Sequence, residues 1–196
     1  HNPRGRSDDK FIATSHEYLI CYSKCIEKLK TFNLIQTRDE IKKKYPKNDA
    51  ISRYRELPLK RSGSNSRRID RPNLFYPIYF NPINNELSLE EKNDFIKILP
   101  LDSGGVERVW RWGKDKVKES FKTEFIVKKI NDNYSIAAKD REKSDIKPKS
   151  LWVNPRYDAS SHGTMLLKKL FTNNEFDYPK SLFAVMDSIQ IGSNSG

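Results

Sequence analysis

Short blocks of apolar residues, separated by polar turns, make up the hydrophobic pattern of this chain. Residues 16–24 are rich in aromatic and β-branched side chains, which predicts a buried strand. Thr37 stands just before an acidic pair, the signature of a helix N-terminus, and Pro46 interrupts that helix. Asp49 predicts the start of a second helix that runs towards Leu57. The first part of the chain is therefore expected to hold one strand and two helices.

Two stretches in the middle of the chain have the composition of β-hairpins. Residues 74–89 hold apolar runs on either side of Asn84-Asn85, and residues 125–139 do so around Asn131-Asp132-Asn133. Asn and Asp tolerate the left-handed backbone that tight hairpin turns need. Residues 95–99 predict one further strand. Antiparallel pairing is therefore expected in this part of the chain.

Helical spacing of apolar residues occurs in two places. Residues 106–121 carry valine, tryptophan and phenylalanine near helical spacing, which predicts one helix there. Near the C-terminus, Ser161 or its neighbours can cap a short amphipathic helix, and Pro179 opens a second helix as its first residue, where a missing N–H costs nothing. Three residues of that second helix are expected in a core: Phe183, Met186 and Ile189.

Hairpins and short helices together predict an α+β (mixed α/β) fold. A chain of 196 residues is long enough for one core or for two small lobes, and a hydrophobic content of 36% predicts a lean, open domain. Charged residues make up 32% of the chain, and the net charge is +11. This positive excess favours an anionic partner. A solvated surface is the better explanation for the scattered lysines, so the clustered arginines carry the inference.

Cysteine and histidine usage argues against a metal site and against hydrolytic catalysis. Cys21 and Cys25 have no second pair and too few histidines around them for zinc, so reduced, buried thiols are expected. His1, His16 and His162 lack nearby nucleophile signatures, and we assign no catalytic residue. No apolar run approaches the roughly 20 residues that span a bilayer, and no signal sequence opens the chain, which predicts a cytoplasmic protein. Because it begins without methionine, an excised piece of a larger protein is expected.

An arginine-rich block at residues 60–71 is the first candidate for chemistry. It combines guanidinium groups with small hydroxyl and amide side chains, and Asp70 is its acidic residue. Arginine can bind guanine bidentately, while serine and asparagine reach phosphate oxygens or adenine. The alternative is a solvated basic loop. The scarcity of acidic partners favours contact with nucleic acid, without choosing between DNA and RNA.

A second block, Arg108-Val109-Trp110-Arg111-Trp112, interleaves two cations with two indoles. This composition suits stacking on bases or contact with a nucleic-acid backbone. Packing is an equally good interpretation. On a helix, tryptophans two residues apart face different directions, so one is expected in the core and the other at its rim.

The whole chain resembles a known family through an ensemble of blocks. The run Ser-His-Gly-Thr-Met-Leu-Leu-Lys-Lys-Leu-Phe at 161–171, the Tyr-Pro-Lys at 178–180 and the arginine block at 60–71 are similar to the C-terminal half of β-class adenine-N6 DNA methyltransferases, especially the modification subunit of type III restriction systems. In that family a block like residues 106–113 recurs inside the target-recognition region. Residues 2–10 look like the loop that follows the catalytic motif and lies close to the flipped base.

The resemblance implies a division of the chain. Residues 1–36 would be a strand region of the catalytic domain after its catalytic motif, residues 37–157 a target-recognition domain with hairpins and short helices, and residues 158–196 a helical segment leading into the cofactor-binding part. The flanking parts would be pieces of a Rossmann-like methyltransferase domain. S-adenosylmethionine is the implied cofactor. The residues implied to approach it are Thr164, Pro179 and Lys180.

The resemblance and the basic blocks together nominate a set of residues for DNA contact. Flipping of the target adenine requires unstacking, and basic side chains near the strand would offset its cost. The residues expected to contact DNA are Arg4, Arg6, Lys10, Lys60, Arg61, Ser64, Asn65, Arg67, Arg68, Arg71, Arg108, Trp110, Arg111, Lys149 and Arg156.

The sequence lacks two signatures of the family, Asp-Pro-Pro-Tyr and Phe-x-Gly-x-Gly. We therefore expect the parent protein to transfer a methyl group to adenine and this chain alone to be inactive. Double-stranded DNA is the implied partner, and the family also admits a restriction endonuclease subunit and a second modification subunit. A non-enzymatic module that binds DNA or RNA is the alternative, and a protein-interaction scaffold for an endonuclease is a third hypothesis.

Overall fold

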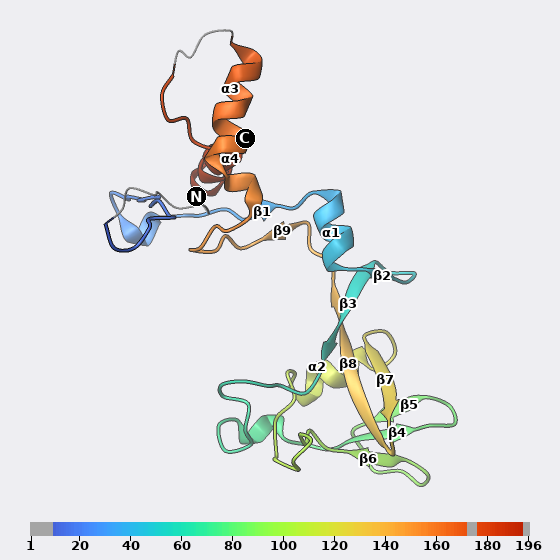
Figure 1. The fold of residues 1–196 in the computed structure, drawn as a ribbon. Coiled ribbons are helices and arrows are strands. Elements are labelled where there is room, and N and C mark those ends of the chain that lie inside the picture. The colour runs from blue at the N-terminus through green and yellow to red at the C-terminus, as the bar shows by residue number, and fades with distance from the viewer. Residues whose placement is uncertain (1–9, 172–175, 194–196) are drawn as a thin grey trace. The chain divides into compact units, whose positions relative to one another are not determined.

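The computed structural model describes residues 10–171 and 176–193, which form two compact units (Figure 1). The first unit combines the two ends of the chain, residues 1–37 and 143–196, and the second comprises residues 38–142. Helices and strands both occur in the described part, so the predicted α+β class is confirmed. The chain passes between the units at 37/38 and 142/143, and the functional division at 37–157 stays a prediction.

A four-stranded antiparallel sheet forms the frame of the second unit, in the order β2-β3-β8-β7. Its strands are β2 (Lys47–Asn48), β3 (Arg53–Pro58), β8 (Asn133–Arg141) and β7 (Phe125–Ile130). The β7–β8 turn places Asn131 at a φ of 54°, as asparagine allows. The hairpin predicted at 125–139 is thus confirmed.

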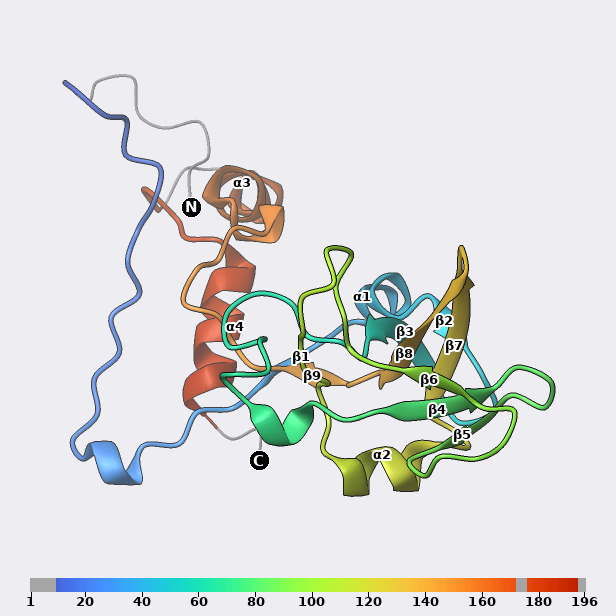
Figure 2. The same ribbon diagram turned by 90° about the horizontal axis from the view of Figure 1, so that it is seen from below.

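A three-stranded antiparallel sheet, ordered β5-β4-β6, packs beside this frame (Figure 2). It consists of β4 (Ile78–Asn81), β5 (Glu86–Ser88) and β6 (Ile96–Ile98), so both the predicted hairpin and the predicted further strand are present. The sheets meet where the rings of Phe80 and Tyr134 lie 5.1 Å apart. Helices α1 (Arg38–Lys44) and α2 (Lys114–Ser120) and the 3-10 turn η2 (Pro72–Leu74) complete the unit.

One apolar core holds the second unit together. Its most buried members come from both sheets, from α2 and from the segment before it: Leu59, Tyr76, Ile78, Phe80, Ile98, Trp110, Val117, Ile136 and Ala138. Each buried aliphatic side chain contributes about 1.5–3 kcal/mol relative to exposure. The second unit therefore carries an interior of its own.

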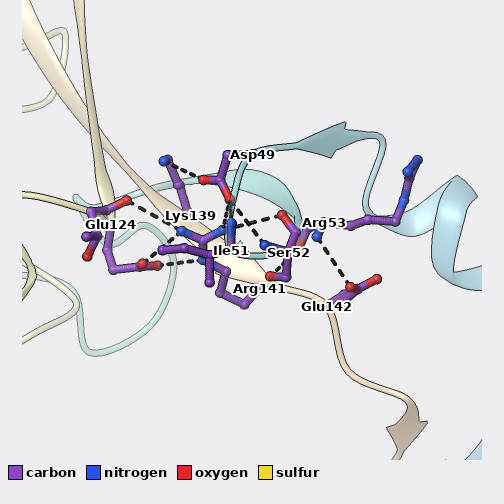
Figure 3. A network of polar contacts seen from close by, with 9 residues as sticks. Asp49, Ile51, Ser52, Arg53, Glu124, Lys139, Arg141 and Glu142 are labelled. Carbon is purple, nitrogen blue, oxygen red and sulfur yellow. Dashed lines mark hydrogen bonds and ion pairs between the residues drawn. The ribbon is translucent and has the colours of Figure 1, made fainter.

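A polar network fixes the turn that leads into β3 (Figure 3). The Asp49 carboxylate accepts hydrogen bonds from Arg141 at 2.6 Å and from Lys139 at 2.7 Å, and also from the N–H groups of Ile51 and Ser52. Arg141 also pairs with Glu124 at 2.9 Å. The helix predicted from Asp49 is therefore wrong, because the Asp49 carboxylate closes a turn and residues 54–58 pair with β8.

In the first unit, short elements surround one longer helix. Strand β1 (Leu34–Ile35) pairs with β9 (Asp145–Ile146), and the 3-10 turns are η1 (Ile26–Lys28) and η3 (Pro155–Tyr157). The π-helical segment η4 (Ser160–Thr164) continues into α3 (Met165–Leu170), and α4 (Leu182–Gly192) follows. Two terminal helices are thus confirmed.

The details of those helix starts differ from the predictions. Asp158, not Ser161, caps the first one, since its carboxylate accepts the Ser161 N–H at 3.0 Å and the Ser161 hydroxyl at 2.7 Å. Ser181 is the N-cap of α4, so Pro179 stands outside the helix. Met186 is 53% exposed and Ile189 is 60% exposed, and the predicted core role of both is wrong.

The strand predicted at 16–24 does not form either. Residues 13–23 have no ladder partner among the described residues, and Tyr22 is 90% exposed. β-propensity reflects packing on a pleated surface, so an apolar run without a neighbouring strand stays unpaired. Cys21 is likewise exposed and Cys25 partly so, although both are free thiols as expected.

Candidate nucleic-acid interface

The two basic blocks of the sequence lie side by side in the second unit. Residues 60–71 pair with residues 107–111 through antiparallel bridges, Lys60 with Trp110 and Arg67 with Arg108. Around these bridges, Arg61 N–H donates to the Val109 carbonyl at 2.9 Å. We call residues 60–71 the basic loop. Its two ends are therefore held on the core by the second block.

The tip of the basic loop is a short, tightly closed turn. Gly63 and Asn65 adopt positive φ values of 85° and 52°. Ser66 is 1% exposed, and its hydroxyl donates to the Gly63 carbonyl at 2.7 Å. Positive φ is easy for glycine and tolerable for asparagine, so these residue types fit the turn. The tip presents Ser64 and Asn65 to solvent.

A second turn follows directly. The Asp70 carboxylate accepts the Arg67 N–H at 3.1 Å, and the Asp70 N–H donates to the Arg67 carbonyl at 3.1 Å. Asp70 therefore caps the backbone of the turn, and its carboxylate forms no ion pair with any arginine in the described part of the chain.

Several predicted DNA-contacting cations are already committed within the protein. Arg108 pairs with Asp102 at 2.8 Å and donates to the Ser66 hydroxyl at 3.2 Å. Arg68 pairs with Glu107 at 3.0 Å and lies over the Phe75 ring. Two others donate to carbonyls, Arg111 to Pro58 at 2.7 Å and Lys60 to Leu101 at 2.6 Å. These side chains stabilise the conformation of the basic loop and of the segment that pairs with it.

Asp102 is the ion-pair partner of Arg108, and no sequence motif pointed to it. Its carboxylate accepts the N–H of Val106 and of Gly104 as well as the Arg108 guanidinium. The Val106 N–H first, and then Arg108, hold the pKa of Asp102 below its usual value. An aspartate two residues before a glycine pair is a turn signal that could have revealed it.

Three arginines of the basic loop keep uncommitted guanidinium groups. Within the described residues, Arg61, Arg67 and Arg71 have no ion pair and no side-chain hydrogen bond. The Nε of Arg61 is buried without an acceptor. Arg67 and Arg71 are exposed. The loop therefore offers three available cations, with the exposed polar side chains of Ser64 and Asn65 at its tip.

Trp110 is not available for stacking. It is 2% exposed, and its indole N–H donates to the Tyr76 carbonyl at 2.7 Å. Residues 106–112 are not helical and α2 begins at Lys114, so the helix predicted over 106–121 forms only in its second half. Trp112 lies in a bend and is partly buried, with its ring 5.4 Å from that of Phe125. Trp110 is thus the core tryptophan and Trp112 lies at the rim of the core, as expected from the sequence.

A pocket of about 290 Å³ lies where the basic loop begins. Its walls include Trp110, Leu101 and Tyr134, and Lys60 and Lys128 also line it. Glu56, another lining residue, is held between Lys47 and Lys128, and these two hydrogen bonds keep its pKa below the ordinary value. No sequence motif pointed to Glu56.

In the first unit, two of the predicted cofactor residues lie where the chain folds back on η4. A Cβ added to Gly163 would come within 2.8 Å of the carbonyl oxygens of Pro179 and Lys180. The Lys180 ammonium pairs with Glu17 at 2.8 Å, and both side chains are half exposed. An exposed pair of this kind contributes little to stability.

Arg156 belongs to a polar cluster at the base of α4. Asp187, 4% exposed, accepts from the Arg156 guanidinium at 2.6 Å and from the Tyr157 hydroxyl at 2.5 Å. The Ser181 hydroxyl donates to the Arg156 carbonyl at 2.7 Å. These bonds tie η3 to α4, so Arg156 has a structural task.

The other predicted residues are scattered. Lys149 and Lys10 are exposed in the first unit, while Arg4 and Arg6 lie outside the described residues. Among residues 10–171 and 176–193, no group of His, Cys, Asp or Glu is arranged to hold a metal ion. In the same ranges, no helix has the length and apolarity to cross a bilayer.

Comparison with known proteins finds two curated relatives. The chain is 32% identical over 189 residues to the type II methyltransferase M.KpnI of Klebsiella pneumoniae, an alignment that covers 94% of this chain and 43% of the relative. It is 28% identical over 201 aligned positions to the type III restriction-modification enzyme EcoPI Mod subunit of Escherichia phage P1, covering 98% of this chain and 31% of the relative. No protein-family model matches, and no solved structure matches significantly.

These relatives confirm the resemblance drawn from the sequence. One is a type II methyltransferase and the other is the Mod subunit of a type III restriction-modification enzyme, and both align with nearly the whole chain. The chain spans less than half the length of either relative.

Proposed function

We propose, from its homology to restriction-modification methyltransferases, that this chain is the target-recognition part of a DNA adenine-N6 methyltransferase, together with adjoining pieces of the catalytic domain. The basic loop carries the proposal, because it is a preformed turn on a buried core that presents Arg61, Arg67 and Arg71 without protein partners among the described residues. Arginine forks on an ordered backbone suit phosphates and base edges.

The first unit supports the second half of the proposal. Its apolar side chains are largely exposed, both in the extended N-terminal segment and on α4: Tyr18, Leu19, Ile20, Tyr22, Leu182, Val185, Met186 and Ile189. Exposed apolar patches of this extent mark surfaces that other protein covers. We assign that cover to the remainder of the methyltransferase domain.

The chemistry would divide between the two parts. The target adenine leaves the base stack, and the methyl group supplied by S-adenosylmethionine moves to N6, which loses one proton. The second unit would bind and orient the duplex. The Lys180 ammonium would hold the cofactor carboxylate. The protein would act in the cytoplasm, with a restriction endonuclease subunit and a second modification subunit as proposed partners.

Binding of duplex DNA by the full-length protein tests the proposal. We expect Arg61→Ala/Arg67→Ala/Arg71→Ala to weaken binding and to lower the slope of log K against log salt by about 0.9 for each phosphate that the variant no longer neutralises. The control is Lys118→Ala/Lys122→Ala/Lys129→Ala, which removes equal charge from exposed positions of the same unit. Equal effects of the two triple variants would remove the basic loop from the interface.

Competition with RNA separates the alternative function. A single-strand RNA binder needs aromatic side chains on which bases stack, whereas Trp110 is buried in the core and Trp112 is partly buried against Phe125. We expect duplex DNA to compete better than single-stranded RNA at equal salt. The opposite order would favour the non-enzymatic RNA-binding hypothesis.

A further inference from the structure

We infer that the side chains of the basic loop divide into base readers, phosphate holders and builders, with Asn65 and Arg67 reading an adenine and a guanine. This inference rests on the proposed function, since it names the specificity-determining residues of the same surface. It separates four arginines of one block that the sequence presents as equivalent: Arg61, Arg67, Arg68 and Arg71.

The builders are identified by their contacts. Arg68 forms a two-oxygen contact with Glu107, at 3.0 and 3.1 Å, and stacks on Phe75. Arg108, which lies outside the loop on the segment that pairs with it, links Asp102 to the buried Ser66 hydroxyl. Reaching a base would require either guanidinium to leave these partners. Both arginines therefore hold the loop in shape.

Asn65 stands at the apex with its backbone fixed on both sides. Gly63 and Ser66 are joined by a hydrogen bond of 2.7 Å, so residues 63–66 form a closed turn. The Asn65 amide is exposed and makes no hydrogen bond within the described residues. An asparagine amide matches the N6 and N7 edge of adenine in the major groove. A fixed backbone lowers the ordering cost of that contact.

Arg67 is likewise pinned through its backbone, while its guanidinium is unengaged within the described part of the chain. Its backbone N–H donates to the Asp70 carboxylate, and its carbonyl accepts the Asp70 N–H. Its backbone also forms a β-bridge with Arg108. The Arg67 side chain is exposed, and Arg67 follows Asn65 by two positions in the sequence. A guanidinium fork binds guanine O6 and N7 bidentately. A residue that recognises a DNA base needs a fixed backbone and an available side-chain head group, and Arg67 has both.

Arg61 and Arg71 stand at the two ends of the basic loop. The backbone N–H of Arg61 donates to the Val109 carbonyl, and the Nε of Arg61 is buried without an acceptor among the described residues. Arg71 immediately precedes the proline that begins η2. Cations that flank a reading tip contact the phosphates on either side of the bases and fix the register. We assign Arg61 and Arg71 this positioning role.

Methylation of a random-sequence duplex library by the full-length protein tests the division. The library is incubated with S-adenosylmethionine, and methylated adenines are mapped with their flanking bases. We expect Arg67→Ala to relax the preference for one guanine, and Asn65→Ala the preference for one adenine, each by roughly 5- to 150-fold. Arg61→Ala and Arg71→Ala should lower methylation of all sites without changing base preference.

Stability and binding readouts keep the outcomes distinct. Arg67→Ala should leave the thermal unfolding midpoint unchanged, because its side chain has no partner among the described residues, whereas Arg68→Ala should lower it. Unchanged base preference in folded Asn65→Ala and Arg67→Ala proteins that still methylate DNA would overturn the inference and leave the proposed function intact. A wild-type protein that neither binds nor methylates duplex DNA would overturn both.

Discussion

Asp49 illustrates how one residue sets the response of the second unit to pH. Its carboxylate lies between Arg141 and Lys139, and these two hydrogen bonds hold the pKa of Asp49 far below its ordinary value of 3.8 (Figure 3). The same contacts, with Glu124, raise the pKa of Arg141. The network joins β3, β8 and the start of β7 at the turn before β3.

The pH dependence of unfolding follows from that lowered pKa. Below about pH 4, Asp49 is protonated in the unfolded chain but still ionised in the folded chain. The free energy of unfolding therefore falls as the pH drops towards the folded pKa. We expect Asp49→Asn to be less stable than the wild type at pH 7 and the difference to shrink between about pH 4 and pH 2. Thermal unfolding at a series of pH values measures this. A constant difference over the range would contradict it.

Gly163 is the second residue whose type is dictated by its surroundings. Because its Cβ would meet the Pro179 and Lys180 carbonyl oxygens at 2.8 Å, we expect Gly163→Ala to destabilise the first unit by about 1–3 kcal/mol. Gly192→Ala is the matched control, since nothing lies within 4 Å of its Cβ and alanine favours the helix. Chemical denaturation of the two variants compares them; equal stability would show that the chain yields freely at Gly163.

At the scale of elements, α4 is held by a buried carboxylate and by one aromatic side chain, Phe183, whose ring lies 5.0 Å from that of His162. Its buried residue is Asp187, while its apolar residues Leu182, Val185, Met186 and Ile189 face outwards. Arg156 and Tyr157 bring η3 to this carboxylate. The helix therefore has a polar anchor on one side and an exposed apolar surface on another.

Removing the anchor should release α4. We expect Asp187→Ala to cost about 3 kcal/mol of stability, because it leaves a part-buried guanidinium without its carboxylate. Tyr157→Phe should cost about 1 kcal/mol, the net contribution of one hydrogen bond. Hydrogen exchange of α4 amides is the measurement, since protection reports local opening. Unchanged exchange in Asp187→Ala would show that other contacts hold the helix.

At the scale of the whole molecule, the two units differ in how many of their apolar side chains are buried. The second unit buries a core from two sheets and a helix, whereas many apolar side chains of the first unit are exposed. The second unit has the ingredients of an independently folding domain.

Expression of residues 38–142 alone tests that independence. We expect one cooperative unfolding transition, and we expect residues 37–157 to unfold with the same midpoint, because β9 within the extra segment pairs with β1 outside it. A non-cooperative transition for 38–142 together with a cooperative one for 37–157 would instead support the boundary predicted from the sequence.

Local chemistry made the hairpins, the first helix and the basic loop predictable. Asn84-Asn85 and Asn131-Asp132-Asn133 accept the backbone of tight turns wherever they occur, and the expected hairpins formed around them. Thr37 and Pro46 likewise bracket the observed helix α1. The scarcity of apolar residues in 60–71 correctly indicated a surface loop, although Ser66 is buried in it.

Tertiary pairing decided what local pattern left open. Residues 106–110 belong to a segment with helical spacing but lie beside the basic loop, since bridges at Trp110 and Arg108 hold them there. Asp49 became a turn because cations on β8 meet its carboxylate. Whether a strand such as residues 16–24 forms depends on a partner, which no local pattern contains.

The sequence by itself determined the turn positions, the α+β class, the positive charge and the homology to restriction-modification methyltransferases, because each depends on residue types and their spacing. Only the tertiary structure decided which arginines are available. Arg67 and Arg68 are neighbours of one type, yet Glu107 and Phe75 engage Arg68, while the head group of Arg67 meets no partner in the described part of the chain. Partners distant in sequence make that difference, and folding alone brings them together.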